Sequence, residues 1–246
     1  MATFKTRISK ISKSNGKVIL ANDYDTTIKN LETKTIQNIK KLNPYLCAIK
    51  LNFHLLLPLS SKQISKINKT AHDYGLQTIA DIKLNDIGNT NQVTTMNLWN
   101  LGFDAVIANP IMGLDSLKNL VKTSHQKQKG VITLCHMSAP EAKLSYDMEV
   151  KITKRLPLYQ LFLSWALESK ADGIVVGATF PQIVSYCKKH VGKKLSIYSP
   201  GVGTQGGNAK EVISYGTDYL IVGRSILNAK NPVEVAKNLK LQSFGK

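Results

Sequence analysis

The sequence lacks any apolar run long enough to cross a membrane, and it contains little cysteine. None of its hydrophobic stretches approaches the roughly 18 residues that a membrane helix needs. Its three cysteines, Cys47, Cys135 and Cys187, are an odd number without the paired spacing of a metal site, and they lie in apolar or helical segments. We therefore expect reduced thiols in a cytoplasmic protein.

Acidic residues are also scarce, because 16 Asp and Glu stand against 33 Lys and Arg, for a net charge of +17. Such an excess is typical of proteins that bind nucleic acid by neutralising phosphates. Here, however, the lysines are spread along the chain and the aromatic residues do not alternate with them, as they do on surfaces that stack single-stranded bases. We expect no nucleic-acid partner, but a solvated basic surface around a site for an anionic substrate.

No linker of Pro, Ser or Gln interrupts the chain, and 43% of its residues are hydrophobic, so we expect one domain over residues 1–246 with a single core. The first 17 residues contain no acidic residue and faintly resemble an organellar transit peptide. We interpret them instead as a short basic helix before the first strand.

Short apolar runs alternate with helix-length amphipathic segments, which predicts parallel strands joined by crossover helices. Eight runs in one chain of this length indicate a closed (β/α)8 TIM barrel of the α/β class rather than an open sheet. The expected strands are Val18–Ala21, Cys47–Leu51, Thr78–Ile82, Ala105–Ala108, Val131–Cys135, Gly173–Gly177, Leu195–Ser199 and Tyr219–Gly223.

Polar residues follow nearly every run at its carboxyl end, and in a barrel those ends converge on the mouth that holds the active site. In the segment IADIKLNDIGNT, Asp81 and Lys83 lie two residues apart, so in a strand they share a face. Lys50 ends the neighbouring strand and Asp86 lies in the following turn. We therefore expect an array of two lysines and two aspartates.

An arbitrary Asp-x-Lys pair is more often a structural ion pair than a functional one. The apolar flanks of this one favour a function, because burying unpaired ions costs several kcal/mol and a buried charge array must be mutually paired.

These residues resemble the orotidine 5'-phosphate decarboxylase family, whose Asp-x-Lys-x-x-Asp-Ile signature is matched by Asp81, Lys83, Asp86 and Ile87. The resemblance covers nearly the whole chain, since further motifs occur in family order: Asp23 after the first strand, Ile49-Lys50, Thr90, Met137-Ser138, the SPGVGTQGG run over 199–207, and IVGRSI over 221–226.

The resemblance implies a cofactor-free barrel that converts orotidine 5'-monophosphate to uridine 5'-monophosphate in pyrimidine biosynthesis, as a homodimer with shared active sites. It implies that Lys83 protonates C6 of the pyrimidine and that Asp81 crowds the departing carboxylate, with Lys50 and Asp86 completing the array. It further implies ribose contacts by Asp23, Lys50, Asp86 and Thr90, a pyrimidine contact by Ser138, and phosphate contacts by Gln205, Gly223 and Arg224. Pro200 and Gly201 belong to the same substrate-binding set, and Asp86, Ile87 and Thr90 are expected to reach the partner's site.

The chemistry of the residues agrees with these roles. Loss of CO2 from a ring carbon leaves an electron pair there, and a fixed ammonium can stabilise that charge and deliver a proton. The glycines of the 199–207 run let backbone N–H groups approach an anion, and loops after the seventh and eighth barrel strands commonly bind phosphate. The polar segment between Ser138 and Arg155 is a candidate lid, since it would otherwise be a long structureless connection; a plain surface loop with a short helix is the alternative.

Two other interpretations stay open. One is a Mg²⁺-dependent sugar-phosphate decarboxylase or aldolase of the same superfamily, but such enzymes carry Glu where this chain has Lys50, which would repel a divalent ion. The five histidines show no ligand spacing either, so we expect no metal site. The other is a basic barrel that binds nucleic acid without catalysis, which the intact charge array argues against.

Overall fold

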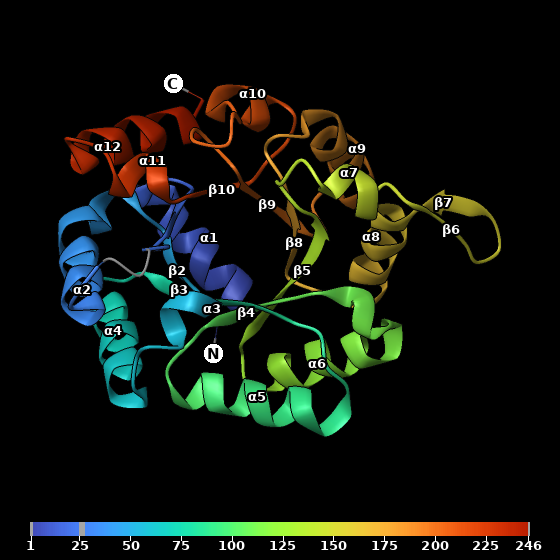
Figure 1. The fold of residues 1–246 in the computed structure, drawn as a ribbon, viewed down its shortest axis with the longest axis horizontal. Coiled ribbons are helices and arrows are strands. Elements are labelled where there is room, and N and C mark those ends of the chain that lie inside the picture. Colours follow the sequence, from blue (N-terminus) through green and yellow to red (C-terminus); the bar gives the residue numbers. More distant parts are fainter. Residues whose placement is uncertain (1, 25–27, 246) are drawn as a thin grey trace.

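The computed structural model describes residues 2–24 and 28–245, which form a closed parallel barrel surrounded by helices (Figure 1). The barrel strands are hydrogen-bonded in the order β1-β10-β9-β8-β5-β4-β3-β2. Their bounds are β1 Val18–Ala21, β2 Ala48–Asn52, β3 Gln77–Leu84, β4 Ala105–Ala108, β5 Gly130–His136, β8 Gly173–Val176, β9 Ser196–Pro200 and β10 Tyr219–Val222. All eight predicted strands are confirmed, with ends within two residues of those expected.

The helices of the outer ring connect these strands in sequence, as the alternating pattern predicts. They are α2 Leu31–Leu42, α4 Ser61–Asp73, α5 Gly88–Asn100, α6 Leu114–Gln126, α8 Leu158–Glu168, α9 Pro181–Val191, α10 Ala209–Ser214 and α12 Pro232–Ser243. Short additional elements are η1 Asn43–Tyr45, α3 Phe53–Leu56, η2 Pro110–Met112, α7 Ala142–Ser145 and α11 Arg224–Leu227. Within the described ranges, no helix has the length and apolarity to cross a membrane.

The strands are buried on both faces, since inward side chains fill the barrel and outward ones pack beneath the helices. All four residues of β1, β4, β8 and β10 are buried. Continuous Val, Ile, Leu and Ala runs are therefore required in place of an alternating pattern.

Helix α1, Phe4–Asn15, precedes the barrel and covers its amino-terminal end, which confirms the predicted basic lead-in helix. Phe4 and Ile8 are completely buried. A side chain at Gly130, the first residue of β5, would come within 2.3 Å of the Phe4 ring, so the glycine makes room for the helix.

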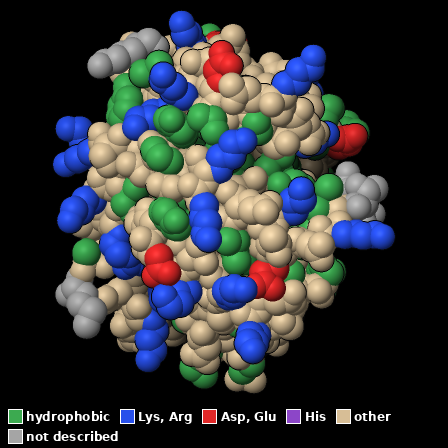
Figure 2. All heavy atoms as spheres, turned by 90° about the vertical axis from the view of Figure 1, so that its left-hand side faces the viewer, with side chains coloured by type: hydrophobic (Ala, Val, Ile, Leu, Met, Phe, Trp, Pro, Cys, Tyr) green, Lys and Arg blue, Asp and Glu red, His purple; other side chains and the backbone are tan. Residues whose placement is uncertain are grey.

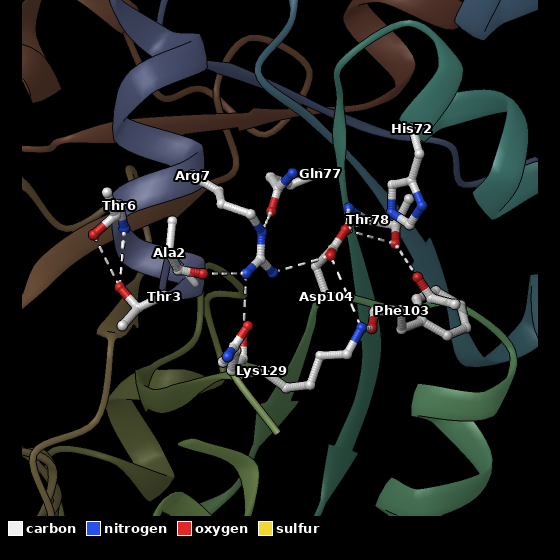
Figure 3. Close-up of polar contacts among 12 residues, drawn as sticks. Ala2, Thr3, Thr6, Arg7, His72, Gln77, Thr78, Phe103, Asp104 and Lys129 are labelled. Atoms are coloured by element: carbon white, nitrogen blue, oxygen red, sulfur yellow. Dashed lines mark hydrogen bonds and ion pairs between the residues drawn. The ribbon is translucent and has the colours of Figure 1, made fainter. Parts of the chain in front are cut away.

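Aspartates placed just before three strands fasten the same end of the barrel. Asp104 accepts a hydrogen bond from the backbone N–H of Thr78 and pairs with His72 of α4, at 2.9 and 2.8 Å, and Arg7 of α1 approaches its other oxygen at 3.1 Å (Figure 3). Asp172 and Asp218 repeat this arrangement with the starts of β5 and β9 and with partners on α6 and α9. Although burial opposes ionisation, the hydrogen bond from His72 keeps the pKa of Asp104 below its ordinary value.

The segment after β5 is not a structureless connection, because it contains a short helix, as the surface-loop alternative expects, and two strands. After α7, strands β6 Glu149–Lys151 and β7 Arg155–Pro157 pair as an antiparallel hairpin that projects from the barrel beside α8 (Figure 1). Val150 pairs with Leu156 at the centre of the hairpin, and the backbone N–H of Leu158 donates to the carbonyl of Met148 at 2.9 Å at its base. A role as a lid stays a prediction.

Candidate active site

A cavity of about 320 Å³ opens at the carboxyl ends of the barrel strands. The residues that line it come from the ends of all eight barrel strands or the loops that follow them. They are Ala21, Asp23, Lys50, Asn52, Asp81, Lys83, Ile107, Leu134, Met137, Ser138, Val175, Pro200, Gly201, Val202, Thr204, Gln205, Ile221, Gly223 and Arg224.

A chain of alternating charges crosses one side of this cavity. The Lys50 ammonium lies 2.8 Å from Asp81 Oδ2 and 3.4 Å from Asp23 Oδ1, and the Lys83 ammonium lies 3.0 Å from Asp81 Oδ1. Each oxygen of Asp81 therefore contacts a different lysine. The register of the two strands explains the contact. Asn52 of β2 lies opposite Asp81 of β3, and Lys50 lies two residues before Asn52, so its side chain is on the same face of the sheet.

Burial opposes ionisation in this cluster and the neighbouring charges outweigh it. Lys50 is 4% exposed and Asp81 is 7% exposed. Burial alone would lower the pKa of Lys50, but the carboxylates of Asp81 and Asp23 raise it. Burial alone would raise the pKa of Asp81, but Lys50 and Lys83 hold it below its ordinary value. Both groups are thus charged at neutral pH. At the two ends of the cluster, the side chains of Lys83 and Asp23 are more exposed, at 37% and 30%, and both line the cavity.

The backbone at Lys83 is in a left-handed conformation, with φ of 45°, which is costly for a residue with a side chain. It lies where the register between β3 and β4 shifts, between Ala80 and Leu84. Lys83 and Asp81 do face the same cavity, as predicted, but an irregular strand end rather than simple alternation sets the direction of the lysine.

Asp23 is held in place by a polar network behind it. The neighbouring Asn22 is completely buried; its amide donates to Thr35 at 2.8 Å and accepts from Asn38 at 2.9 Å. The backbone N–H of Asn22 donates to the carbonyl of Lys50 at 3.0 Å. The network therefore fixes the loop after β1 against β2, on which Lys50 lies.

The glycine-rich run forms a compact loop on the opposite side of the cavity. Gly201 has φ of 92°, and a side chain there would come within 2.8 Å of Gln205 Oε1 and 2.9 Å of Ser138 Cβ. Glycine thus brings Ser138, Gln205 and the loop backbone together. Gly203 has φ of 80°, and a Cβ on it would collide with Ser225 Oγ at 2.2 Å.

Arg224 begins α11 directly after Gly223, and its guanidinium lies at the rim beside this loop. It makes no ion pair with any side chain in the described part of the chain, and it is exposed. A bidentate donor of this kind, next to glycine backbone, is suited to a phosphate group.

Sequence reasoning missed the apolar wall of the cavity and the support of the loop. The wall is lined by Ile107, Leu134, Val175 and Ile221. Successive residues of a strand face opposite sides, so these four could have been told from outward-facing core residues only by counting from a known site residue on the same strand. The hydroxyl of Ser225 accepts from the backbone N–H of Thr204 at 3.1 Å, and no sequence signal distinguished that serine.

Ten of the thirteen predicted site residues line the cavity, and Asp86, Ile87 and Thr90 do not. All three are exposed. The carboxylate of Asp86 accepts a hydrogen bond from its own Ile87 N–H at 2.8 Å. Of the four residues predicted for the charge array, the described part of one chain therefore brings together Lys50, Asp81 and Lys83. Asp23, and not Asp86, is the second carboxylate of the cluster.

Over the described ranges, no group of three or more His, Cys, Asp and Glu is arranged to hold a metal ion. His136, the last residue of the cavity strand β5, is completely buried and turned towards Tyr146, Tyr159 and Phe180. The three cysteines are buried and unpaired, as expected for reduced thiols.

The family model described as "Orotidine 5'-phosphate decarboxylase / HUMPS family" matches residues 16–239. Among curated proteins, the orotidine 5'-phosphate decarboxylase of Pyrococcus abyssi is 32% identical over 223 residues, covering 90% of this chain and 96% of that protein. The enzyme of the same name from Methanosarcina acetivorans is 36% identical over 192 residues, covering 78% and 80% of the two chains.

A solved structure of the orotidine 5'-monophosphate decarboxylase of Methanocaldococcus jannaschii, complexed with the inhibitor BMP, superposes with a TM-score of 0.78 at 29% identity. The superposition covers 92% of this chain and 97% of that one. The similarity thus extends over the whole barrel, including every strand that contributes to the cavity.

Proposed function

The chain belongs to the orotidine 5'-phosphate decarboxylase / HUMPS family, and on that basis we propose that it decarboxylates orotidine 5'-monophosphate to uridine 5'-monophosphate, a step of pyrimidine biosynthesis. The observation that carries the proposal is the Lys50-Asp81-Lys83 cluster at the cavity floor, with each oxygen of Asp81 on a different lysine. Loss of orotidylate absorbance on mixing with the purified protein tests it directly, and unchanged absorbance at substrate-saturating concentration would refute it.

In the proposed reaction, the bond between C6 and the carboxylate carbon breaks, CO2 leaves, and the electron pair stays on C6. The Lys83 ammonium stabilises that charge and transfers a proton to C6, and solvent then reprotonates the amine. Asp81 remains ionised because Lys50 and Lys83 lower its pKa, so it repels a substrate carboxylate placed beside it. Lys50 holds Asp81 in position and, with Asp23, is available to ribose hydroxyls.

The nucleotide phosphate would lie between the 201–207 loop and Arg224, with the pyrimidine edge towards Ser138. This orientation is supported by the distribution of the lining residues, since donors for an anion lie at one side of the cavity and the charge cluster at the other. Phosphate contacts away from the ring supply binding energy that positions the reacting carbon.

Replacing Arg224 with alanine is expected to weaken nucleotide binding and kcat/KM together, by about 10- to 100-fold, because charge-assisted hydrogen bonds contribute about 1.5–3 kcal/mol. Fluorescence or calorimetric titration with uridine 5'-monophosphate and initial rates measure the two effects. Lys122→Ala, which removes one exposed positive charge on α6 outside the cavity, is the control and should leave both unchanged. An unaltered kcat/KM in Arg224→Ala would remove this residue from the site.

The second candidate is the Mg²⁺-dependent sugar-phosphate decarboxylase or aldolase of the same superfamily, and Lys50 argues against it. Its ammonium occupies the space between Asp23 and Asp81, where a divalent ion would need unpaired carboxylates. We therefore expect chelators such as EDTA to leave decarboxylation unaffected. Inactivation that Mg²⁺ reverses would move the chain to the metal-dependent branch.

The proposal includes a homodimer with shared sites. After Asp86, Ile87 is exposed just before α5, and Thr90, Val93 and Met96 are exposed along α5 on the side opposite its buried residues. Exposed apolar side chains such as Ile87, Val93 and Met96 are suited to a two-fold contact with a second copy. Such a contact would bring Asp86 of one subunit to the site of the other and complete the array of two lysines and two aspartates.

The cytoplasmic location also stays a prediction, based on the three unpaired cysteines.

A further inference from the structure

A second cleft, of about 900 Å³, lies at the opposite end of the barrel from the active site. It is lined by Ser196 and Tyr219, the first residues of β9 and β10, whereas Pro200 and Ile221, further along the same strands, line the active-site cavity. One side of it is formed by helix α1. Its remaining lining residues are Lys5, Thr6, Ser9, Lys10, Ser12, Lys13, Lys17, Asp218 and Phe244.

Four lysines face this cleft against one acidic residue. Asp218 is already neutralised, because both of its oxygens lie 2.9 Å from the Lys188 ammonium and one also accepts from the backbone N–H of Ile197. The Lys5 ammonium donates to the carbonyls of Lys194 and Lys193, at 2.6 and 3.4 Å, which are uncharged. Within the described residues, Lys10, Lys13 and Lys17 have no carboxylate within 4.0 Å. The cleft therefore keeps an uncompensated positive charge.

The other groups around the cleft are the donors that phosphate oxygens need. Thr6, Ser9 and Ser196 present hydroxyls beside the lysines, and Ser9 lies one turn from Lys5 and from Lys13, on one face of α1. Hydroxyls interspersed with ammonium groups are the usual protein donors to phosphate oxygens. This arrangement differs from the face in Figure 2, where the Lys and Arg side chains are scattered among other residues. It differs also from Lys66 of α4, which pairs with Glu32 of α2 at 2.7 Å.

We propose that this cleft is a second anion site, which binds a small molecule with two or three adjacent phosphoryl groups. A single phosphate would leave most of the lysines uncompensated, because three are distributed along α1 and the fourth, Lys17, directly precedes β1. Phe244, 38% exposed at the edge of the cleft, offers an apolar surface to a nucleoside base. The ligand is therefore either a free nucleotide polyphosphate or inorganic polyphosphate.

Calorimetric titration with inorganic triphosphate tests the site, with uridine 5'-monophosphate present in excess to fill the active site. We expect one equivalent to bind, and the triple variant Lys10→Ala/Lys13→Ala/Lys17→Ala to weaken binding at least tenfold. The matched control, Lys62→Ala/Lys66→Ala/Lys69→Ala on α4, removes the same charge elsewhere and should change the affinity less than twofold. Thermal melting of both variants without ligand checks that they fold.

Further arms of the titration separate the two sources of ligand. Tighter binding of adenosine triphosphate than of inorganic triphosphate, reduced by Phe244→Ala, supports a nucleotide; equal binding supports the inorganic ligand. Failure of triphosphate to bind, competition by uridine 5'-monophosphate, or equal losses in the two triple variants would each overturn the proposal. Binding of single-stranded RNA to the same lysines without any triphosphate binding would also overturn it.

Discussion

Replacing Lys83 with alanine is expected to abolish nearly all turnover, with kcat lower by about 10⁴-fold or more, while binding of uridine 5'-monophosphate is retained. A positioned general acid contributes about 10²–10⁴-fold and an electrostatic donor about 10²–10³-fold, and Lys83 is proposed to supply both. Its charge acts mainly on the electron pair that develops in the transition state, so the product, which carries no such charge, loses little.

Replacement of Lys83 tests the chemistry with less effect on folding than replacement of Lys50, because of how the two lysines contact Asp81. When Lys83 is removed, Asp81 keeps Lys50 at 2.8 Å, so no buried carboxylate is left unpaired. When Lys50 is removed, Asp81 and Asp23 both lose a buried partner, which destabilises the fold as well as the site. Lys122→Ala, on the exposed side of α6, is the control for loss of one lysine. A loss of nucleotide affinity comparable to the loss of kcat would contradict the role of Lys83 as proton donor.

Mixing two inactive variants is expected to restore activity if the sites are shared. Lys83→Ala removes the proton donor, and Asp86→Asn removes the carboxylate that is proposed to cross to the partner's site. In a mixed dimer one site then carries both lesions and the other carries neither. Random subunit exchange makes about half of the dimers mixed and leaves one of their two sites intact, so activity should return to roughly a quarter of the wild-type value.

In the single chain, the exposed Asp86 lies outside the cavity, and its carboxylate accepts only a local hydrogen bond from the backbone N–H of Ile87 among the described residues. Native mass spectrometry of isotopically labelled subunits monitors the exchange. As a control, two Lys83→Ala preparations are mixed, and they should remain inactive. If exchange is complete and no activity returns, Asp86 acts in the site of its own subunit and the shared-site proposal is wrong.

The sequence determined the barrel because the physical causes of each strand are local. Runs such as Val18–Ala21 and Ala105–Ala108 are apolar throughout, and only strands covered on both faces need that pattern. The polar residues at the carboxyl ends of the runs then identified the mouth, since parallel strands bring all those ends to one side. For this reason Lys50, Asp81, Lys83 and Arg224 could be assigned to one site before any contact was known.

The tertiary structure alone decided which charges meet and which conformations hold them. The positive φ of Lys83 and the shifted register of β3 depend on neighbouring strands, so strand periodicity could not indicate them. Asp86 lies only three residues after Lys83, yet its side chain is outside the cavity, because the chain has left the barrel wall by then. The basic cleft at the other end also depends on tertiary packing, because helix α1 lies against strands β9 and β10, which begin about 180 and 200 residues later in the sequence. Sequence spacing determines which residues share an element, whereas contacts between distant elements depend on how those elements pack.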